Sequence, residues 1–163
     1  MVDDLWPTFY NPLYLAEKLT GSNRELIEVN FFCTQPPVHM LKGTEKDITN
    51  YKAQQSYYSA IGKLEKVNMF YGRLTGLPNS LQEKDLDTQM AVQILEKAFS
   101  QRYDICVIIA NDGDYASAVQ VIKSYKKRVE LVYFKGKCSM HLRSLADLPR
   151  KAKRSYFQAM PIK

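Results

Sequence analysis

The feature that most constrains the fold is a run of six apolar residues at positions 105–110, followed at once by Asn-Asp-Gly-Asp at 111–114. Because the run does not alternate with polar residues, it is typical of a parallel strand that is covered on both faces by helices. A helical pattern follows at 116–125 and a second apolar strand at 129–134, which indicates a strand, helix, strand unit with a right-handed crossover. The sequence therefore predicts an α/β fold.

The rest of the chain continues this alternation of helices and strands. Apolar residues at three- and four-residue steps predict helices, short runs rich in apolar residues predict strands, and Gly, Pro and Asn mark a loop at 76–80. The expected helices are 13–19, about 45–64, 87–99 and a short one at 141–147, and the expected strands are 26–32 and 67–74. With 163 residues, 45% of them hydrophobic, we expect one domain over 1–148 and a basic tail over 149–163.

Several classes of protein are not favoured by the sequence. The apolar runs are strand-length, far short of the roughly 20 residues that span a bilayer, and the N-terminus lacks a basic start followed by an apolar segment. Three widely spaced cysteines, Cys33, Cys106 and Cys138, form no Cys-x-x-Cys pair that would indicate a zinc site or a disulfide framework. We therefore expect a cytoplasmic protein with reduced thiols.

Charge is distributed unevenly along the chain. From residue 120 onward there are twelve Lys or Arg residues and two acidic ones, whereas residues 1–119 carry eleven basic and fifteen acidic residues. A basic part beside an acidic part suits a polyanion that is held by the first and cut at the second. A solvated lysine-rich surface with a basic tail would give the same composition, so both interpretations stay open.

The residues that could carry chemistry lie directly after the apolar strand. In an open parallel sheet, ligands bind at the carboxyl ends of the strands, which is where Asp112 and Asp114 are expected. Gly113 allows a sharp turn between them, so that both carboxylates could share a hard cation such as Mg²⁺ or Mn²⁺ and activate a water for attack on a phosphate. The helix that begins near Asp87 would bring a third carboxylate to the same edge.

Each carboxylate also has a purely structural interpretation. Asp87 and Asp114 could cap the helices that follow them, and Asp112 could form a turn bond with the backbone. An Asp-Gly-Asp after an apolar strand is also compatible with a phosphatase that forms an aspartyl-phosphate, although that motif would belong near an N-terminus. Aromatic residues could stack on unpaired bases or pack in the core: Phe9, Tyr10, Tyr57, Tyr58 and Tyr115.

Three segments together resemble one known family. Residues 83–95 contain Lys84-Asp-Leu-Asp87 at the start of a helix, residues 103–115 contain the strand and Asp-Gly-Asp, and residues 127–134 contain Lys-Arg-Val-Glu-Leu-Val-Tyr-Phe. This order is similar to the NYN domain family, a branch of the PIN-like ribonucleases. The resemblance implies a PIN-like, doubly wound, mainly parallel sheet with helices on both faces, and cleavage of RNA with Mg²⁺ or Mn²⁺ at Asp87, Asp112 and Asp114.

Two departures from the family pattern matter for the fold and the site. Ala110 stands where the family usually has Ser or Thr. The family also opens with a central strand that ends in Asp-x-x-Asn, and this first strand is missing from the sequence before residue 13. The strands at 26–32 and 105–110 could then pair directly, the N-terminal segment could add an irregular strand, or a partner chain could supply one.

These observations lead to two functional hypotheses. In the first, the chain is a metal-dependent endoribonuclease that hydrolyses phosphodiester bonds in single-stranded RNA, either alone or as a homodimer. In the second, it is a catalytically degenerate RNA-binding or scaffold protein that keeps the fold and the basic surface. In both we expect four residues to contact RNA: Lys84, Asn111, Lys135 and Lys137.

Overall fold

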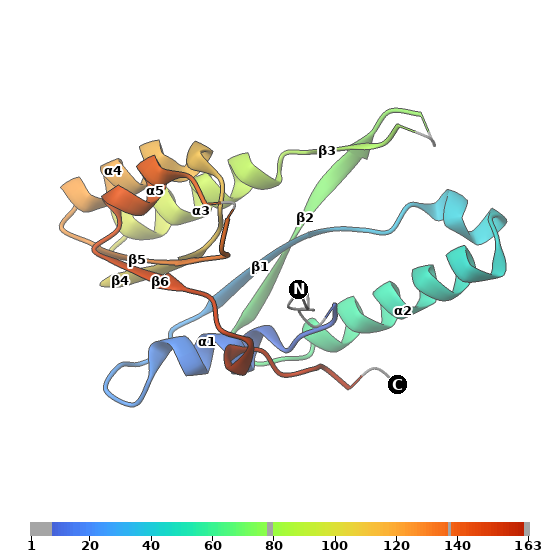
Figure 1. The fold of residues 1–163 in the computed structure, drawn as a ribbon, viewed down its shortest axis with the longest axis horizontal. Coiled ribbons are helices and arrows are strands. Elements are labelled where there is room, and N and C mark those ends of the chain that lie inside the picture. Colours follow the sequence, from blue (N-terminus) through green and yellow to red (C-terminus); the bar gives the residue numbers. More distant parts are fainter. Residues whose placement is uncertain (1–7, 78–79, 137, 162–163) are drawn as a thin grey trace. The chain divides into compact units, whose positions relative to one another are not determined.

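The computed structural model describes residues 8–77, 80–136 and 138–161. The chain divides into two compact units: residues up to Leu86 together with those from Arg154 onward form the first, and Asp87–Lys153 forms the second. Each unit combines helices with parallel strands (Figure 1), which confirms the predicted α/β class. The single domain expected over 1–148 and the doubly wound sheet stay predictions, as does Lys137, which lies outside the described residues.

The first unit has a three-stranded sheet with the order β1–β2–β3. Strand β1 runs parallel to β2, and β3 runs antiparallel to it, so that Val29 pairs with Val67 and Arg73 with Lys84. The described elements are α1 (Pro12–Thr20), β1 (Val29–Thr34), a 3₁₀ helix (Val38–Lys42), α2 (Glu45–Ile61), β2 (Val67–Thr75) and β3 (Gln82–Lys84). The strand expected at 26–32 therefore begins three residues later than predicted.

Local signals at the helix ends explain where the first unit's helices begin. The side chain of Asn11 accepts hydrogen bonds from the backbone N–H groups of Leu13 and Tyr14 at the start of α1. At the start of α2, Thr44 and Asp47 form a capping box, in which each side chain accepts a hydrogen bond from the other residue's backbone N–H. These bonds satisfy backbone donors that a helix leaves unpaired in its first turn.

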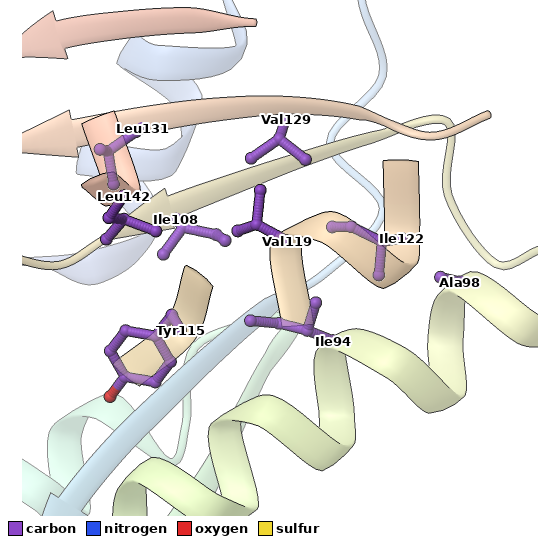
Figure 2. Packing of buried hydrophobic residues seen from close by; sticks show 9 residues of the cluster. All are labelled: Ile94, Ala98, Ile108, Tyr115, Val119, Ile122, Val129, Leu131 and Leu142. Carbon is purple, nitrogen blue, oxygen red and sulfur yellow. The ribbon is translucent and has the colours of Figure 1, made fainter. Parts of the chain in front are cut away.

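The second unit has a fully parallel sheet with the order β4–β5–β6. Its elements are α3 (Leu86–Phe99), β4 (Ile105–Ile109), a 3₁₀ turn (Gly113–Tyr115), α4 (Ala116–Ser124), β5 (Arg128–Tyr133), α5 (Met140–Leu145) and β6 (Leu148–Lys151). The 3₁₀ turn at Arg154–Tyr156 belongs to the first unit. Side chains of α3, α4 and α5 pack with those of β4 and β5 in one buried cluster (Figure 2). The strand, helix, strand unit predicted from the apolar run is confirmed.

Strand β5 is buried along both of its faces. Val129 and Leu131 belong to the cluster in Figure 2, and the intervening Glu130 and Val132, which point to the opposite face, are no more than 1% exposed. Glu130 is buried as an ion pair with Arg150 of β6. A charge so deeply buried requires such a partner.

Strand β6 includes the first residues of the basic tail that we expected over 149–163. Arg150 and Lys151 pair with Val132 and Tyr133 of β5, and Ala152 is buried. The segment is ordered by its neighbours, because its own sequence, with a proline and three basic residues at 148–153, has little preference for a strand. The basic residues after 149 are thus in part a sheet edge.

Strands β1 and β4 each lie at the end of their sheet in the described residues. The direct pairing between them that we considered stays a prediction. The longest described helix, α2, has 17 residues, and no described helix combines the length and hydropathy needed to cross a bilayer. All three cysteines have free thiols, as predicted.

Candidate functional site

The loop after β4 carries two exposed carboxylates on a short turn. Strand β4 ends at Ile109, and the side chain of Asp112 accepts a hydrogen bond from the backbone N–H of Asp114, 3.1 Å away. This is the turn bond that the structural interpretation of Asp112 required. The N-cap of α4 is Tyr115, which makes no side-chain cap bond, so Asp114 does not serve as the cap of that helix.

The acidic loop is held by a second loop that follows β5. The side-chain oxygen of Asn111 accepts a hydrogen bond from Phe134 N–H at 2.8 Å, and its backbone oxygen accepts one from Ser139 N–H at 2.8 Å. A Cβ added at Gly113 would lie 2.9 Å from Ser139 Oγ. A larger residue would therefore have to displace the side chain of Ser139, and Gly113 does not adopt the left-handed backbone that a sharp turn would have required.

Asp87 lies in the first turn of α3, where a negative charge is favoured by the helix dipole. Its Oδ1 accepts a hydrogen bond from the hydroxyl of Tyr115. Because Tyr115 directly follows Asp114, this bond joins the beginning of α3 to the acidic loop across 28 residues of sequence. Asp87 thus lies beside the 112–114 loop, as the site hypothesis required, although its ligation of a metal stays a prediction.

All three carboxylates affect the pKa of the Tyr115 hydroxyl. Burial, followed by the hydrogen bond and charge of Asp87 and the charges of Asp112 and Asp114, raises the pKa of this phenol above its ordinary value. The hydroxyl therefore stays protonated and acts as a donor. Its ring packs in the buried cluster, and its oxygen points away from the other labelled side chains (Figure 2).

An open pocket of about 640 Å³ lies at this loop. It is lined by residues 109–113, by Tyr115, and by Cys138 and Ser139 from the second loop. Burial raises the pKa of the Cys138 thiol, which favours its neutral form. No group of three or more Asp, Glu, His or Cys side chains in the described residues is arranged to enclose a metal ion. In this structure Asp87 is bonded to the hydroxyl of Tyr115, and Asp112 is bonded to the backbone N–H of Asp114.

The residues expected to contact RNA lie in different places. Lys135 is exposed and follows the carboxyl end of β5, and because β5 is parallel to β4, it lies at the same sheet edge as the acidic loop. Lys84 lies in β3 of the first unit, and its approach to the carboxylates stays a prediction. The amide oxygen of Asn111 is already bonded to Phe134, so only its NH₂ group could serve RNA.

Two functional residues were missed by the sequence analysis. Tyr115 was considered only as a stacking or core residue, yet its hydroxyl contacts a predicted site residue. Ser139 was not considered, although its side chain accepts a hydrogen bond from Leu142 N–H and caps α5. A serine three residues before a leucine is a recognisable start signal for a helix, whereas nothing in the sequence indicates the partner of Tyr115.

Comparisons with known proteins give one match to a family and one to a fold. The sequence profile of the NYN domain matches residues 10–150. No curated protein matches the sequence. The structure is similar to the crystal structure of a protein of unknown function from Vibrio parahaemolyticus, with a TM-score of 0.60 and 13% identity over 91% of this chain and 80% of that chain. At this identity, the likeness concerns the fold alone.

Proposed function

Because the chain belongs to the NYN domain family, a nuclease-like family, we propose that it is a metal-dependent endoribonuclease that hydrolyses phosphodiester bonds in RNA. The observation that carries the proposal is the hydrogen bond between Tyr115 and Asp87, which links the start of α3 to the residue that directly follows Asp114. Asp112 and Tyr115 line an open pocket at the carboxyl edge of a parallel sheet, where catalytic and ligand-binding groups are commonly found.

The donor set suits Mg²⁺ or Mn²⁺. These ions prefer carboxylate oxygens, and Mg²⁺ is usually held by one or two carboxylates together with water and substrate phosphates, without a complete cage of protein ligands. Asp112 and Asp114 are exposed on one turn and could hold such an ion, with Asp87 contributing beside them. The lack of a three-residue metal group in the described residues is compatible with an ion that is completed by the phosphate.

The bound ion would neutralise charge on the phosphate and lower the pKa of a bound water. Basic residues of the chain would bind the RNA backbone. Lys135 lies at the same edge as the carboxylates and would offset the charge of the RNA backbone, as would Lys84 if it approaches the site. We expect the substrate to be single-stranded RNA, whose bases are not already paired.

The second candidate function is RNA binding without cleavage. It is favoured by the bonds that the carboxylates already make, because Asp87 is bonded to Tyr115 and Asp112 to the backbone of Asp114. In that case the basic residues would still bind RNA. The logarithm of the binding constant would fall by about 0.7 for each phosphate contact when the salt concentration rises tenfold. The carboxylates would then only stabilise the loop and the start of α3.

The experiment that separates the two functions replaces Asp112 and, separately, Asp114 with Asn. We expect each variant to lose about 100-fold or more in the rate of Mn²⁺-dependent cleavage of labelled single-stranded RNA, because removing one preorganised charged group typically costs 10²–10³. Asp104→Asn is a matched control, since Asp104 is an exposed carboxylate just before the opposite end of β4.

Cleavage that is equal in wild type and the two site variants would refute the nuclease proposal. If wild type neither cleaves RNA nor binds Mn²⁺ at millimolar concentration, but binds RNA in a salt-dependent way, the second function is correct. RNA binding by the variants should stay within about twofold of wild type, because the substitutions remove negative charge without removing a basic residue.

We also infer that the fold is a PIN-like doubly wound sheet that needs one more strand than the described residues supply. The inference is supported by the positions of β1 and β4, each at the end of its own sheet, and by the family match. An experimental structure in which β1 and β4 are directly hydrogen-bonded would contradict it. The homodimer and the cytoplasmic location expected from the sequence stay predictions.

A further inference from the structure

Two tyrosines of the second unit reach α3 with their hydroxyl groups, and they do so in different ways. Tyr103 donates its hydroxyl to the backbone oxygen of Ile94, 2.8 Å away, in the middle of the helix. Tyr115 donates to the side chain of Asp87 at the start of the same helix. The first bond is purely structural, whereas the second ends on a carboxylate of the candidate site.

The ring of Tyr115 is fixed more firmly than a surface residue would be. The side chain is 7% exposed and packs in the cluster that contains Val119 and Leu142, and its backbone belongs to the 3₁₀ turn that begins at Gly113. Asp87, by contrast, is exposed, and without a partner its carboxylate would sample several rotamers. The hydrogen bond from Tyr115, whose ring is fixed in the core, therefore restricts the rotamers of Asp87.

The hydroxyl of Tyr115 is bonded to a carboxylate. The charges of Asp87, Asp112 and Asp114 all act on it. Carboxylates that approach one another repel, and a neutral donor bonded to one of them offsets part of that repulsion without adding a competing positive charge. The bond occupies Oδ1 of Asp87 and leaves Oδ2 available.

We propose that Tyr115 is a positioning residue that holds the Asp87 carboxylate at the acidic loop, so that Oδ2 can ligate the divalent cation. The proposal rests on the proposed function, because it assigns Tyr115 to the same site. Hydrogen-bond partners of metal-ligating carboxylates orient the ligand, and their loss typically costs 10–100-fold in metal affinity or activity. Tyr115 makes no contact with the reacting atoms and acts through Asp87 alone.

The test compares Tyr115→Phe with Tyr103→Phe. Both substitutions remove one hydroxyl that is bonded to α3 and leave the ring in the core. The first readout is the dissociation constant for Mn²⁺ alone, measured by calorimetry or by paramagnetic resonance of the free ion. We expect Tyr115→Phe to weaken Mn²⁺ binding 10–100-fold and Tyr103→Phe to change it less than twofold.

A second readout uses Asp87→Asn. If Tyr115 acts only through Asp87, adding Tyr115→Phe to Asp87→Asn should cause no further loss of Mn²⁺ affinity, so the two effects should not add. In cleavage assays, Tyr115→Phe should lower kcat while KM for RNA stays within about twofold. A merely structural hydroxyl would give additive effects and no separation of kcat from KM.

The outcomes distinguish this inference from the function on which it rests. If wild type binds Mn²⁺ and Asp112→Asn abolishes that binding, but Tyr115→Phe does not weaken it, the positioning role is wrong and the proposed function survives. Tighter binding by Tyr115→Phe would show that the hydroxyl competes with the ion, and equal losses in both tyrosine variants would show a general effect on the core. If wild type binds no Mn²⁺ and cleaves no RNA, both proposals are wrong.

Discussion

The two sheets of this protein differ in how their strands meet solvent. In the second unit, four consecutive residues of β5, from Val129 to Val132, are buried. In the first unit, β2 has nine residues, none of which is buried, and its exposure alternates along most of the strand. A strand covered on both faces needs a continuous apolar run, whereas a strand with one open face needs only alternation.

The polar contacts of the two sheets follow the same difference. On the first sheet, Asn30 and Asn68 of neighbouring strands are joined by a side-chain hydrogen bond of 3.2 Å in an exposed position. On the second sheet the main charged contact, between Glu130 and Arg150, is buried. The predicted catalytic carboxylates all belong to the second unit: Asp112 and Asp114 lie on the loop after β4, and Asp87 lies at the start of α3. A site that must hold ligands in fixed positions benefits from support by a packed core, and the second sheet supplies it.

The difference between the two sheets predicts a large change in the free energy of unfolding for a substitution at Glu130. Glu130→Ala should lower the free energy of unfolding by about 3 kcal/mol, because it removes a buried side chain and leaves Arg150, whose side chain is only 23% exposed, without this partner. Glu83→Ala in β3 should cost less than about 0.5 kcal/mol, because Glu83 is exposed and makes only a 3.3 Å bond to Thr34. Urea denaturation followed by circular dichroism measures both.

A double variant sharpens this prediction. Replacing Glu130 and Arg150 together with Met should recover most of the loss, since apolar residues of similar volume can replace a buried ion pair. If Glu130→Ala and Glu83→Ala were equally mild, the contrast between a covered sheet and an open one would be wrong.

The next prediction compares two leucines in the sheets. Leu131→Ala in β5 should cost about 2–5 kcal/mol, because the side chain is 1% exposed and its removal leaves a cavity in the cluster. Leu74→Ala in β2 should cost about 1 kcal/mol, since Leu74 is half-buried and the site can be reached by water. Equal losses in denaturation experiments would mean that the first sheet is packed as tightly as the second.

The same contrast explains how much could be predicted from the sequence. The continuous apolar run identified β4, and the residue pattern after it identified α4 and the edge on which Asp112 and Asp114 lie. The start of α3 at Leu86 placed Asp87 within reach of that edge. These inferences depend on local patterns of apolar residues, namely a continuous run for a buried strand and a helical period for a helix with one buried face.

Other features depend on contacts between distant residues, and no local pattern indicates them. Strand β3 consists of three exposed polar residues and exists because β2 extends far enough to pair with it antiparallel. Strand β6 contains Pro149 and is ordered by β5 and by the buried pair of Arg150 with Glu130. The bond from Tyr115 to Asp87 likewise joins two residues that the sequence separates. Tertiary context decides each of these.

The smallest prediction concerns pH and the edge of the second sheet. A hydrogen bond from Lys123, followed by one from the backbone N–H of Val129, lowers the pKa of the Asp147 carboxyl below its ordinary value of 3.8. A lowered pKa in the folded state means that the carboxylate stabilises the fold above the unfolded pKa, and that this contribution is lost as pH falls through the folded pKa. Asp147→Asn should thus cost about 1 kcal/mol at pH 7, a value discounted for partial exposure.

The stability lost in Asp147→Asn should depend on pH, because it comes from the charge of the carboxylate. The difference in unfolding free energy between wild type and Asp147→Asn should be constant from pH 7 to about pH 5 and should shrink below about pH 4, as the wild-type carboxylate gains its proton. Amide exchange should place the loss at Val129 and its neighbours in β5, because the carboxylate bonds that N–H directly. A difference that stayed constant down to pH 2 would show that the charge of the carboxylate contributes nothing to it.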